Sequence, residues 1–169
     1  MVEMEVVTVQ IDGGANSPVV VLRERAETAR LLPILIGHPE ALAITFALER
    51  YTTPRPMTHD LLHDVIEDLG ASVQRIEITH LQNGTFYAQL VISTEAGERS
   101  ISSRPSDAIA IALRVPCPIM VDESVLEIAG VAPEEPTQAH AEVEGGDDVV
   151  EQFREFIDSV NPDDFNPNG

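Results

Sequence analysis

The chain has 169 residues, enough for one domain with a sizeable core, and 43% of them are hydrophobic. Aromatic residues make up only 4% and Trp is absent, so the core must be aliphatic. No apolar run reaches the roughly 18 residues of a transmembrane helix, and the N-terminus does not resemble a signal peptide. The single cysteine cannot form an internal disulfide, and we therefore expect a cytoplasmic protein with no membrane association.

The net charge of −19 is distributed unevenly along the chain. Residues 130–169 contain eleven acidic residues and one base, Arg154, whereas residues 1–129 contain eighteen acidic residues and nine bases. Every base is Arg. A field of this sign repels polyanions at long range. Nucleic-acid binding would therefore need a local Arg cluster or bound divalent cations.

The order of the expected elements predicts an α+β fold. Val- and Ile-rich segments with partial alternation predict strands, helical periodicity between capping residues predicts helices, and Asn83-Gly84 predicts a hairpin. Because strands and helices do not alternate regularly, we predict a mixed, mostly antiparallel sheet with helices packed on it. The expected strands are residues 4–11, 18–22, 31–36, 72–79, 85–93, 99–102 and 119–121, and the expected helices are residues 40–51, 58–69, 103–115 and 122–129.

We predict a folded domain at residues 1–130, an acidic flexible linker at residues 131–146, and a C-terminal amphipathic helix with a polar tail at residues 147–169. The apolar side of that last helix must be buried against its own core, another subunit or another protein. Its apolar positions are Val149, Val150, Phe153, Ile157 and Val160.

Two expected helices begin with the same pattern of an Arg-Pro pair, a hydroxyl and an aspartate. A helix N-terminus offers free backbone N–H groups and a favourable dipole to an anion, and a neighbouring Arg adds a bidentate partner. Asp and His in the same turns could bind a divalent cation or act as a base. The second of these helices is apolar almost all round and must be buried. The residues concerned are Arg55, Thr58, His59 and Asp60 in the first helix, and Arg104, Ser106 and Asp107 in the second.

A purely structural interpretation accounts for the same residues. Thr58, and either Ser103 or Ser106, are expected to be ordinary helix caps, and an aspartate in a first turn complements the helix dipole. His59 and His63, four residues apart, favour a solvated helix face over a metal site. Cys117, between two prolines in an apolar run, is expected to be a buried thiol.

The sequence resembles the bifunctional nuclease family of bacteria and plants over about residues 3–130. The resemblance implies RNase and DNase activity, which plant members are described as having, and it supplies no catalytic set. Residues 153–156 and 162–165 resemble the tail of the actinobacterial branch. The motifs lie at residues 32–41, at Arg55-Pro56 with residues 58–61, at residues 84–88, and at residues 103–108 with Ala110, Ala112 and Pro118-Ile119.

These observations lead to two hypotheses. The first is a nuclease that hydrolyses phosphodiester bonds of RNA or DNA with Mg²⁺ or Mn²⁺. The second is a non-catalytic regulatory or scaffold module whose acidic tail docks a protein partner. We expect a homo-oligomer in either case, because edge strands and apolar helix faces need cover. In the first hypothesis Asp107, Asp60 and His59 are catalytic, Arg55, Arg104, Ser106 and Thr58 bind the substrate phosphate, and Asp60, Asp107 and Glu40 hold the metal.

Overall fold

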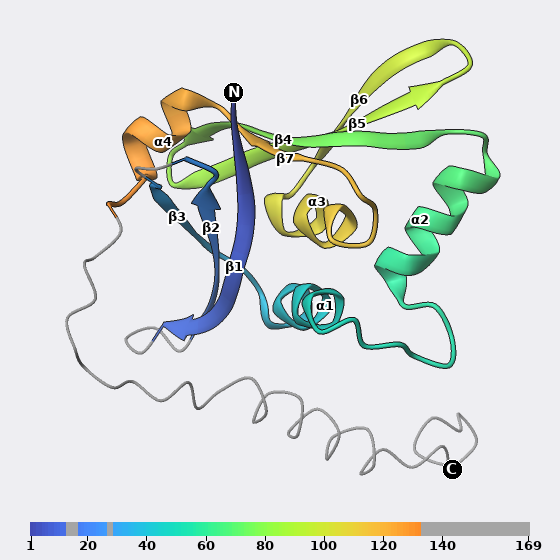
Figure 1. Cartoon of the computed structure of the whole chain (residues 1–169), viewed down its shortest axis with the longest axis horizontal. Helices are drawn as coiled ribbons and strands as arrows, with labels where there is room; N and C mark the ends of the chain where they lie inside the picture. Colours follow the sequence, from blue (N-terminus) through green and yellow to red (C-terminus); the bar gives the residue numbers. More distant parts are fainter. Residues whose placement is uncertain (13–16, 27–28, 133–169) are drawn as a thin grey trace. The chain divides into compact units, whose positions relative to one another are not determined.

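The computed structural model describes residues 1–12, 17–26 and 29–132 (Figure 1). They form a seven-stranded sheet and four helices, which confirms the predicted α+β class. The strands are β1 (Val2–Asp12), β2 (Ser17–Glu24), β3 (Leu31–Leu35), β4 (Ser72–Gln82), β5 (Thr85–Thr94), β6 (Gly97–Ser103) and β7 (Ile119–Val121). The helices are α1 (His38–Leu48), α2 (Thr58–Asp68), α3 (Pro105–Ala112) and α4 (Glu123–Ala129).

The sheet has the order β3-β2-β1-β7-β4-β5-β6. The short strand β7 joins its two halves, since it pairs antiparallel with β1 and parallel with β4, and the remaining pairs are antiparallel. The sheet is therefore mixed and mostly antiparallel, as predicted. Asn83 and Gly84 both have positive φ, 51° and 76°, and turn β4 into β5 as that dipeptide predicts.

Pro33 lies in β3, at one edge of the sheet, where a missing N–H donor breaks no ladder. At its first residue this edge strand is also paired with Val131 through two backbone hydrogen bonds of 2.8 Å. The described fold thus continues through the first residue of the predicted linker. The rest of that linker and the predicted C-terminal helix and tail lie outside the described residues.

The helix α3 is the buried helix that the sequence predicts. Four consecutive residues, Ala108 to Ile111, are 0% exposed. They pack in one aliphatic core with β-strand residues such as Ile76 and Ile78 and with Ile44 of α1. The helices α1 and α3 are in contact and lie on the same side of β4 and β7 (Figure 1). Burial of this helix on all sides fixes the place of its first turn.

The helix α2 differs from the sequence prediction at its start. Its N-cap is Met57, so Thr58 is the first helical residue and does not cap the helix. Its apolar stripe is mostly uncovered, because α2 packs edge-on against α3 and β4 and buries only Ile66. The other apolar residues of the stripe are between 40% and 79% exposed, namely Leu61, Leu62, Val65 and Leu69.

Among the described residues, no helix combines the length and apolar character needed to cross a membrane.

Candidate functional site at three helix N-termini

The two Arg-Pro helix starts that the sequence singles out meet in the folded chain. His59 Nε2 of α2 lies 3.3 Å from Asp107 Oδ1 of α3. Arg104, the N-cap of α3, donates hydrogen bonds of 2.8 and 3.2 Å to the same carboxylate. Its remaining terminal nitrogen lies 2.7 Å from Glu40 Oε1 in the first turn of α1. We call Glu40, His59, Arg104 and Asp107 the Arg104 cluster.

Each member of the cluster occupies the start of a helix for a local reason. Pro105 stands at the first helical position of α3, where its missing N–H is not needed, and places Arg104 just before the helix and Asp107 in its first turn. Pro39 stands at the second helical position of α1, where its missing N–H is likewise not needed, next to Glu40. A carboxylate in a first turn is stabilised by the positive end of the helix dipole. Three helix N-termini therefore gather two carboxylates and one imidazole around one guanidinium.

The Arg104 cluster is partly exposed to solvent. The side chains of His59 and Glu40 are 13% and 14% exposed, Asp107 is 30% exposed, and Arg104 is 66% exposed. The cluster thus faces solvent on its Arg104 side. The hydrogen bonds and charge of Asp107, followed by those of Glu40, raise the pKa of the Arg104 guanidinium.

The carboxylate of Asp60 belongs to a second network. Its Oδ1 accepts a hydrogen bond from Arg114 Nε, and its Oδ2 accepts one of 2.9 Å from the backbone N–H of Met57. Burial opposes the charge of this carboxyl and would raise its pKa, but the hydrogen bonds from Arg114 and Met57 outweigh burial and hold the pKa below its usual range. Both oxygens of Asp60 are therefore engaged outside the Arg104 cluster.

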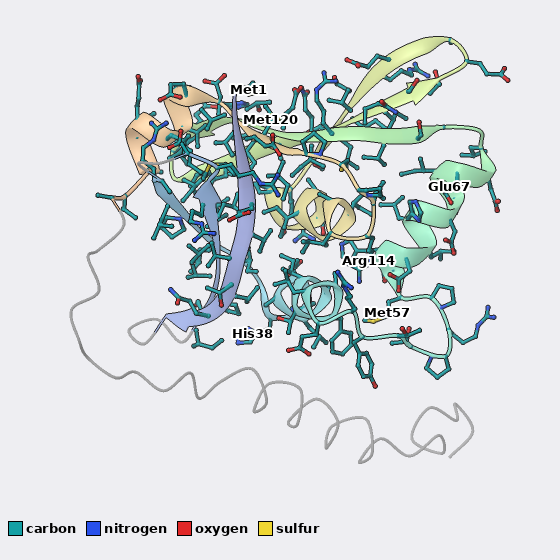
Figure 2. The ribbon with its side chains drawn as sticks, viewed as in Figure 1. Met1, His38, Met57, Glu67, Arg114 and Met120 are labelled. Atoms are coloured by element: carbon teal, nitrogen blue, oxygen red, sulfur yellow. The ribbon has the colours of Figure 1, made fainter. Side chains whose placement is uncertain are left out.

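Arg114 connects three helices, and the sequence pattern did not mark it as a site residue. Its side chain is 11% exposed, and its Nη1 donates to the carbonyl oxygens of Ala43 at 3.1 Å and Ala110 at 2.8 Å. Figure 2 shows Arg114 in the space beside α1, α2 and α3. The only sequence signal was a single Arg inside an apolar run, which requires a buried partner without saying which.

The remaining predicted site residues are more dispersed. Arg55 is exposed, and within the described residues its side chain has no hydrogen-bonding or ionic partner. Thr58 is exposed at the first position of α2, whereas Ser106 is only 6% exposed at the second position of α3. The expectation that Ser103 or Ser106 caps α3 is wrong, because its N-cap is Arg104. His63 lies 3.4 Å from Glu67 on the flank of α2, which fits the solvated helix face expected for it.

The carboxylates and histidines do not form a ready-made metal cage. Within residues 1–12, 17–26 and 29–132, no group of three or more His, Cys, Asp or Glu side chains is arranged to hold a metal ion. The carboxylates of Glu40 and Asp107 both face the guanidinium of Arg104, and that of Asp60 faces Arg114.

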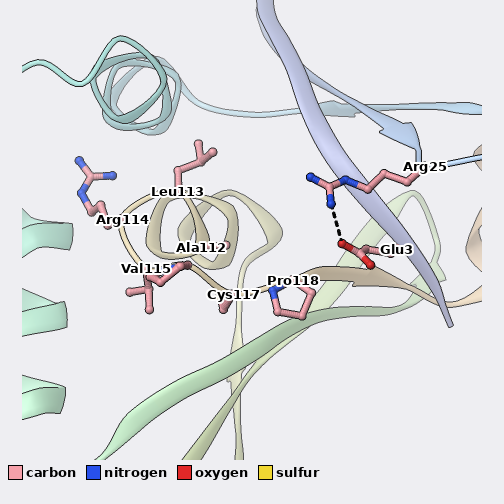
Figure 3. A pocket seen from close by; sticks show the side chains of 9 residues that line it. Glu3, Arg25, Ala112, Leu113, Arg114, Val115, Cys117 and Pro118 are labelled. Carbon is pink, nitrogen blue, oxygen red and sulfur yellow. Dashed lines mark hydrogen bonds and ion pairs between the residues drawn. The ribbon is translucent and has the colours of Figure 1, made fainter.

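Two depressions lie in the described surface near these helices. One, of about 340 Å³, is lined by residues 34–37, 84–86 and 104–106 and thus adjoins the Arg104 cluster. The other, of about 670 Å³, is lined by residues 112–118 with Glu3 and Arg25, whose side chains form an ion pair of 3.1 Å on its wall (Figure 3). Cys117 belongs to this second depression, where burial raises the pKa of its thiol to about 11, as expected for an unreactive cysteine.

The family model for the bifunctional nuclease domain matches residues 20–134, and the chain belongs to this family. The resemblance noted from the sequence motifs is thereby confirmed.

Among its relatives, an uncharacterized protein of Mycobacterium tuberculosis is 46% identical over 165 residues, which cover 98% of each chain. The protein named bifunctional nuclease 1 in Oryza sativa subsp. indica is 28% identical over 127 residues, covering 73% of this chain and 38% of the rice protein. Bifunctional nuclease 1 of Arabidopsis thaliana is 29% identical over 112 residues, covering 64% of this chain and 34% of its own length. The chain therefore matches only about a third of each plant protein.

Proposed function

We propose that the protein is a nuclease that hydrolyses phosphodiester bonds at the Arg104 cluster. The observation that carries the proposal is the contact between His59 and Asp107 beside the exposed guanidinium of Arg104. This contact supports the proposal, because it would give the site a proton acceptor, a carboxylate to orient it and a cation to bind phosphate. The names of the plant relatives support the same class of reaction. The net charge of −19 opposes nucleic-acid binding at long range, so a local cation is required.

His59 is the group that would activate water. Its Nε2 lies 3.3 Å from Asp107 Oδ1. In the tautomer that carries its proton on Nε2, this N–H donates a hydrogen bond to the carboxylate, and the lone pair of the ring is on Nδ1. Nδ1 would accept a proton from water as the water oxygen bonds to phosphorus. The P–O bond to the leaving oxygen breaks, and that oxygen takes a proton from solvent. Asp107 would stabilise the imidazolium that forms.

Arg104 would bind the phosphate through its exposed guanidinium. At present Asp107 and Glu40 share that guanidinium, so it must exchange at least one carboxylate for the phosphate. Glu40 and Asp107 supply the oxygen donors that Mg²⁺ or Mn²⁺ prefer, and with Arg104 displaced they would hold such an ion. Bound there, the ion would supply positive charge to the reacting phosphate.

We assign Asp60 a positioning role, because both of its oxygens are engaged by Arg114 and Met57. It fixes the first turn of α2 and with it the adjacent His59. Arg55 and Thr58, exposed near the start of the same helix, remain available to the flanking substrate backbone. The scaffold alternative with a docking tail concerns a segment outside the described residues.

The test is cleavage of labelled single-stranded RNA and DNA oligonucleotides by the purified full chain with Mg²⁺, with Mn²⁺ and with EDTA. A positioned general base contributes about 10²–10⁴-fold, so His59→Ala and Asp107→Asn should each lower the cleavage rate by at least about 100-fold. Loss of cleavage in EDTA would support the metal-dependent form. Equal cleavage in EDTA would remove the metal from the proposal.

His63→Ala is the matched control, since His63 lies one turn further along α2 and pairs only with surface acids. It should cleave at the wild-type rate. Arg104→Lys keeps the charge but loses the bidentate guanidinium, and we expect a higher KM for the substrate. Cleavage that survives in both His59→Ala and Asp107→Asn would come from a contaminant and would end the proposal.

A further inference from the structure

We infer that the 340 Å³ depression between the first turns of α1 and α3, called here the α1–α3 depression, is a binding site for one nucleotide. The phosphate would lie on Ser106 and Arg104, and the base on Phe86. The inference rests on the proposed function in taking the nucleotide as part of a nucleic-acid substrate, and it adds a subsite beside the reacting phosphate. The depression is lined by residues 34–37, 84–86 and 104–106.

Ser106 is the observation that points to a ligand. Among the described residues it is the only polar residue in the buried class, at 6% exposure, and its hydroxyl makes no hydrogen bond there. Among the described residues, the only side-chain oxygen or nitrogen that is both inaccessible to solvent and without a hydrogen bond is Ser103 Oγ. Because Ser106 Oγ also has no hydrogen bond, it must keep some accessible surface. Ser106 lines the depression. A hydroxyl that reaches the depression and has no protein partner is free to donate a hydrogen bond to an acceptor oxygen bound there.

The first turn of α3 adds donors at the same place. Arg104, its N-cap, makes no side-chain cap hydrogen bond, so the backbone N–H groups of Ser106 and Asp107 keep the free donors of a helix start. The dipole of α3 adds positive potential there. An anion at this position therefore meets two backbone N–H groups, the Ser106 hydroxyl and the Arg104 guanidinium.

The start of α1 does not offer a second anion position. The carboxylate of Glu40 folds back over Gly37, so closely that an added Cβ at Gly37 would lie 2.2 Å from Glu40 Oε2. That negative charge is neutralised by Arg104, 2.7 Å away. We therefore expect the phosphate to bind at the start of α3 and not at the start of α1.

The apolar part of the lining suits a base. Phe86 follows the β4–β5 turn, is partly buried and packs against the hydrophobic core, so its ring is held in place. Ile34 and Ile36 are further apolar residues of the lining. Base stacking on an aromatic ring contributes about 1–3 kcal/mol and tolerates any base. A volume of about 340 Å³ is at the small end of ligand pockets, which suits a single unpaired nucleotide.

The experiment is an NMR titration of the ¹⁵N-labelled full chain with uridine 5′-monophosphate, inorganic phosphate and uridine in separate arms. We expect the nucleotide to shift the amide signals of Ser106 and Asp107 and those of the β4–β5 turn, and to bind more tightly than either fragment. Ser106→Ala should weaken nucleotide binding about 5-fold or more, equivalent to one lost hydrogen bond of about 1 kcal/mol. Phe86→Leu should weaken binding of the nucleotide and leave binding of inorganic phosphate unchanged.

Ser100→Ala, an exposed serine of β6, is the matched control and should bind like wild type. Nucleotide binding unchanged by Ser106→Ala would overturn the inference, and so would uridine binding as tightly as its monophosphate or inorganic phosphate binding as tightly as the nucleotide. If the wild type binds nucleotide but cleaves no oligonucleotide, the proposed nuclease function fails while the subsite stands.

Discussion

Replacing Arg114 with Met tests whether this residue holds the three site helices together. The change removes the donors to Asp60, to Ala43 O and to Ala110 O, and keeps an apolar side chain in place of the aliphatic stem. Removing one partner of a buried ion pair destabilises by about 3–5 kcal/mol. Asp60 is 36% exposed, so water partly replaces the lost donor, and we expect about 2–3 kcal/mol.

The assay is urea unfolding followed by circular dichroism, with thermal unfolding as a second measurement. For a domain of this size 1 kcal/mol corresponds to about 3 °C, so the Tm of Arg114→Met should fall by about 6–9 °C. Asp60→Asn should lower the Tm by less, because Arg114 still donates hydrogen bonds to the carbonyl oxygens of Ala43 and Ala110. The double variant should lose less than the two single losses added together, since both remove the same contact.

Arg25→Met is the matched control. Arg25 is 58% exposed and pairs with Glu3 and Glu5 at the surface, and each such pair is worth at most about 1 kcal/mol. A loss for Arg114→Met no larger than that of Arg25→Met would refute the argument that Arg114 joins α1, α2 and α3. Exact additivity in the double variant would refute the coupling between Arg114 and Asp60.

Two further predictions concern α2. Because the pKa of Asp60 is lowered in the fold, its charge stabilises the protein fully above the unfolded-state pKa of about 4 and ceases to do so as the pH falls through the folded pKa. The difference in unfolding free energy between wild type and Asp60→Asn should therefore shrink from pH 7 to pH 3, and an unchanged difference would contradict this assignment. The exposed apolar side chains of α2 are the described surface that we expect to carry the predicted homo-oligomer. Leu69→Glu, at a position 79% exposed, should lower the mass measured by light scattering, and a monomeric wild type would contradict the expectation.

The elements of the fold were predictable because their signals are local. Asn83-Gly84 permits the positive φ values of a tight hairpin, Pro33 restricts its strand to an edge, and the continuous apolar run from Ala108 to Ile111 requires burial. The stripe of α2 shows the limit of such signals. Periodicity specifies which residues share a helix face, but the position of α2 against α3 and β4 decides that only Ile66 is covered.

The sequence allowed most residues of the candidate site to be predicted, but not which of them pair with one another. The repeated Arg-Pro pattern identified Arg104, Asp107, His59 and Asp60 as charged groups at helix starts. It could not separate them into two networks, because Arg114 approaches Asp60 from 54 positions along the chain. Thr58 resembles a cap in sequence, yet Met57 occupies the N-cap position. The backbone N–H of Met57 donates a hydrogen bond to the carboxylate of Asp60, which stabilises the first turn of the helix.

The sequence by itself determined that a buried aliphatic helix begins with Arg, Ser and Asp, since apolar residues on every side leave that helix no solvent-facing position. Only the tertiary structure decided that the starts of α1 and α2 meet it there. Which carboxylate pairs with which Arg depends on contacts between residues far apart in the chain, and local propensity carries no information about them. The same packing buries most of Ser106 beside the α1–α3 depression and leaves Arg104 exposed next to it.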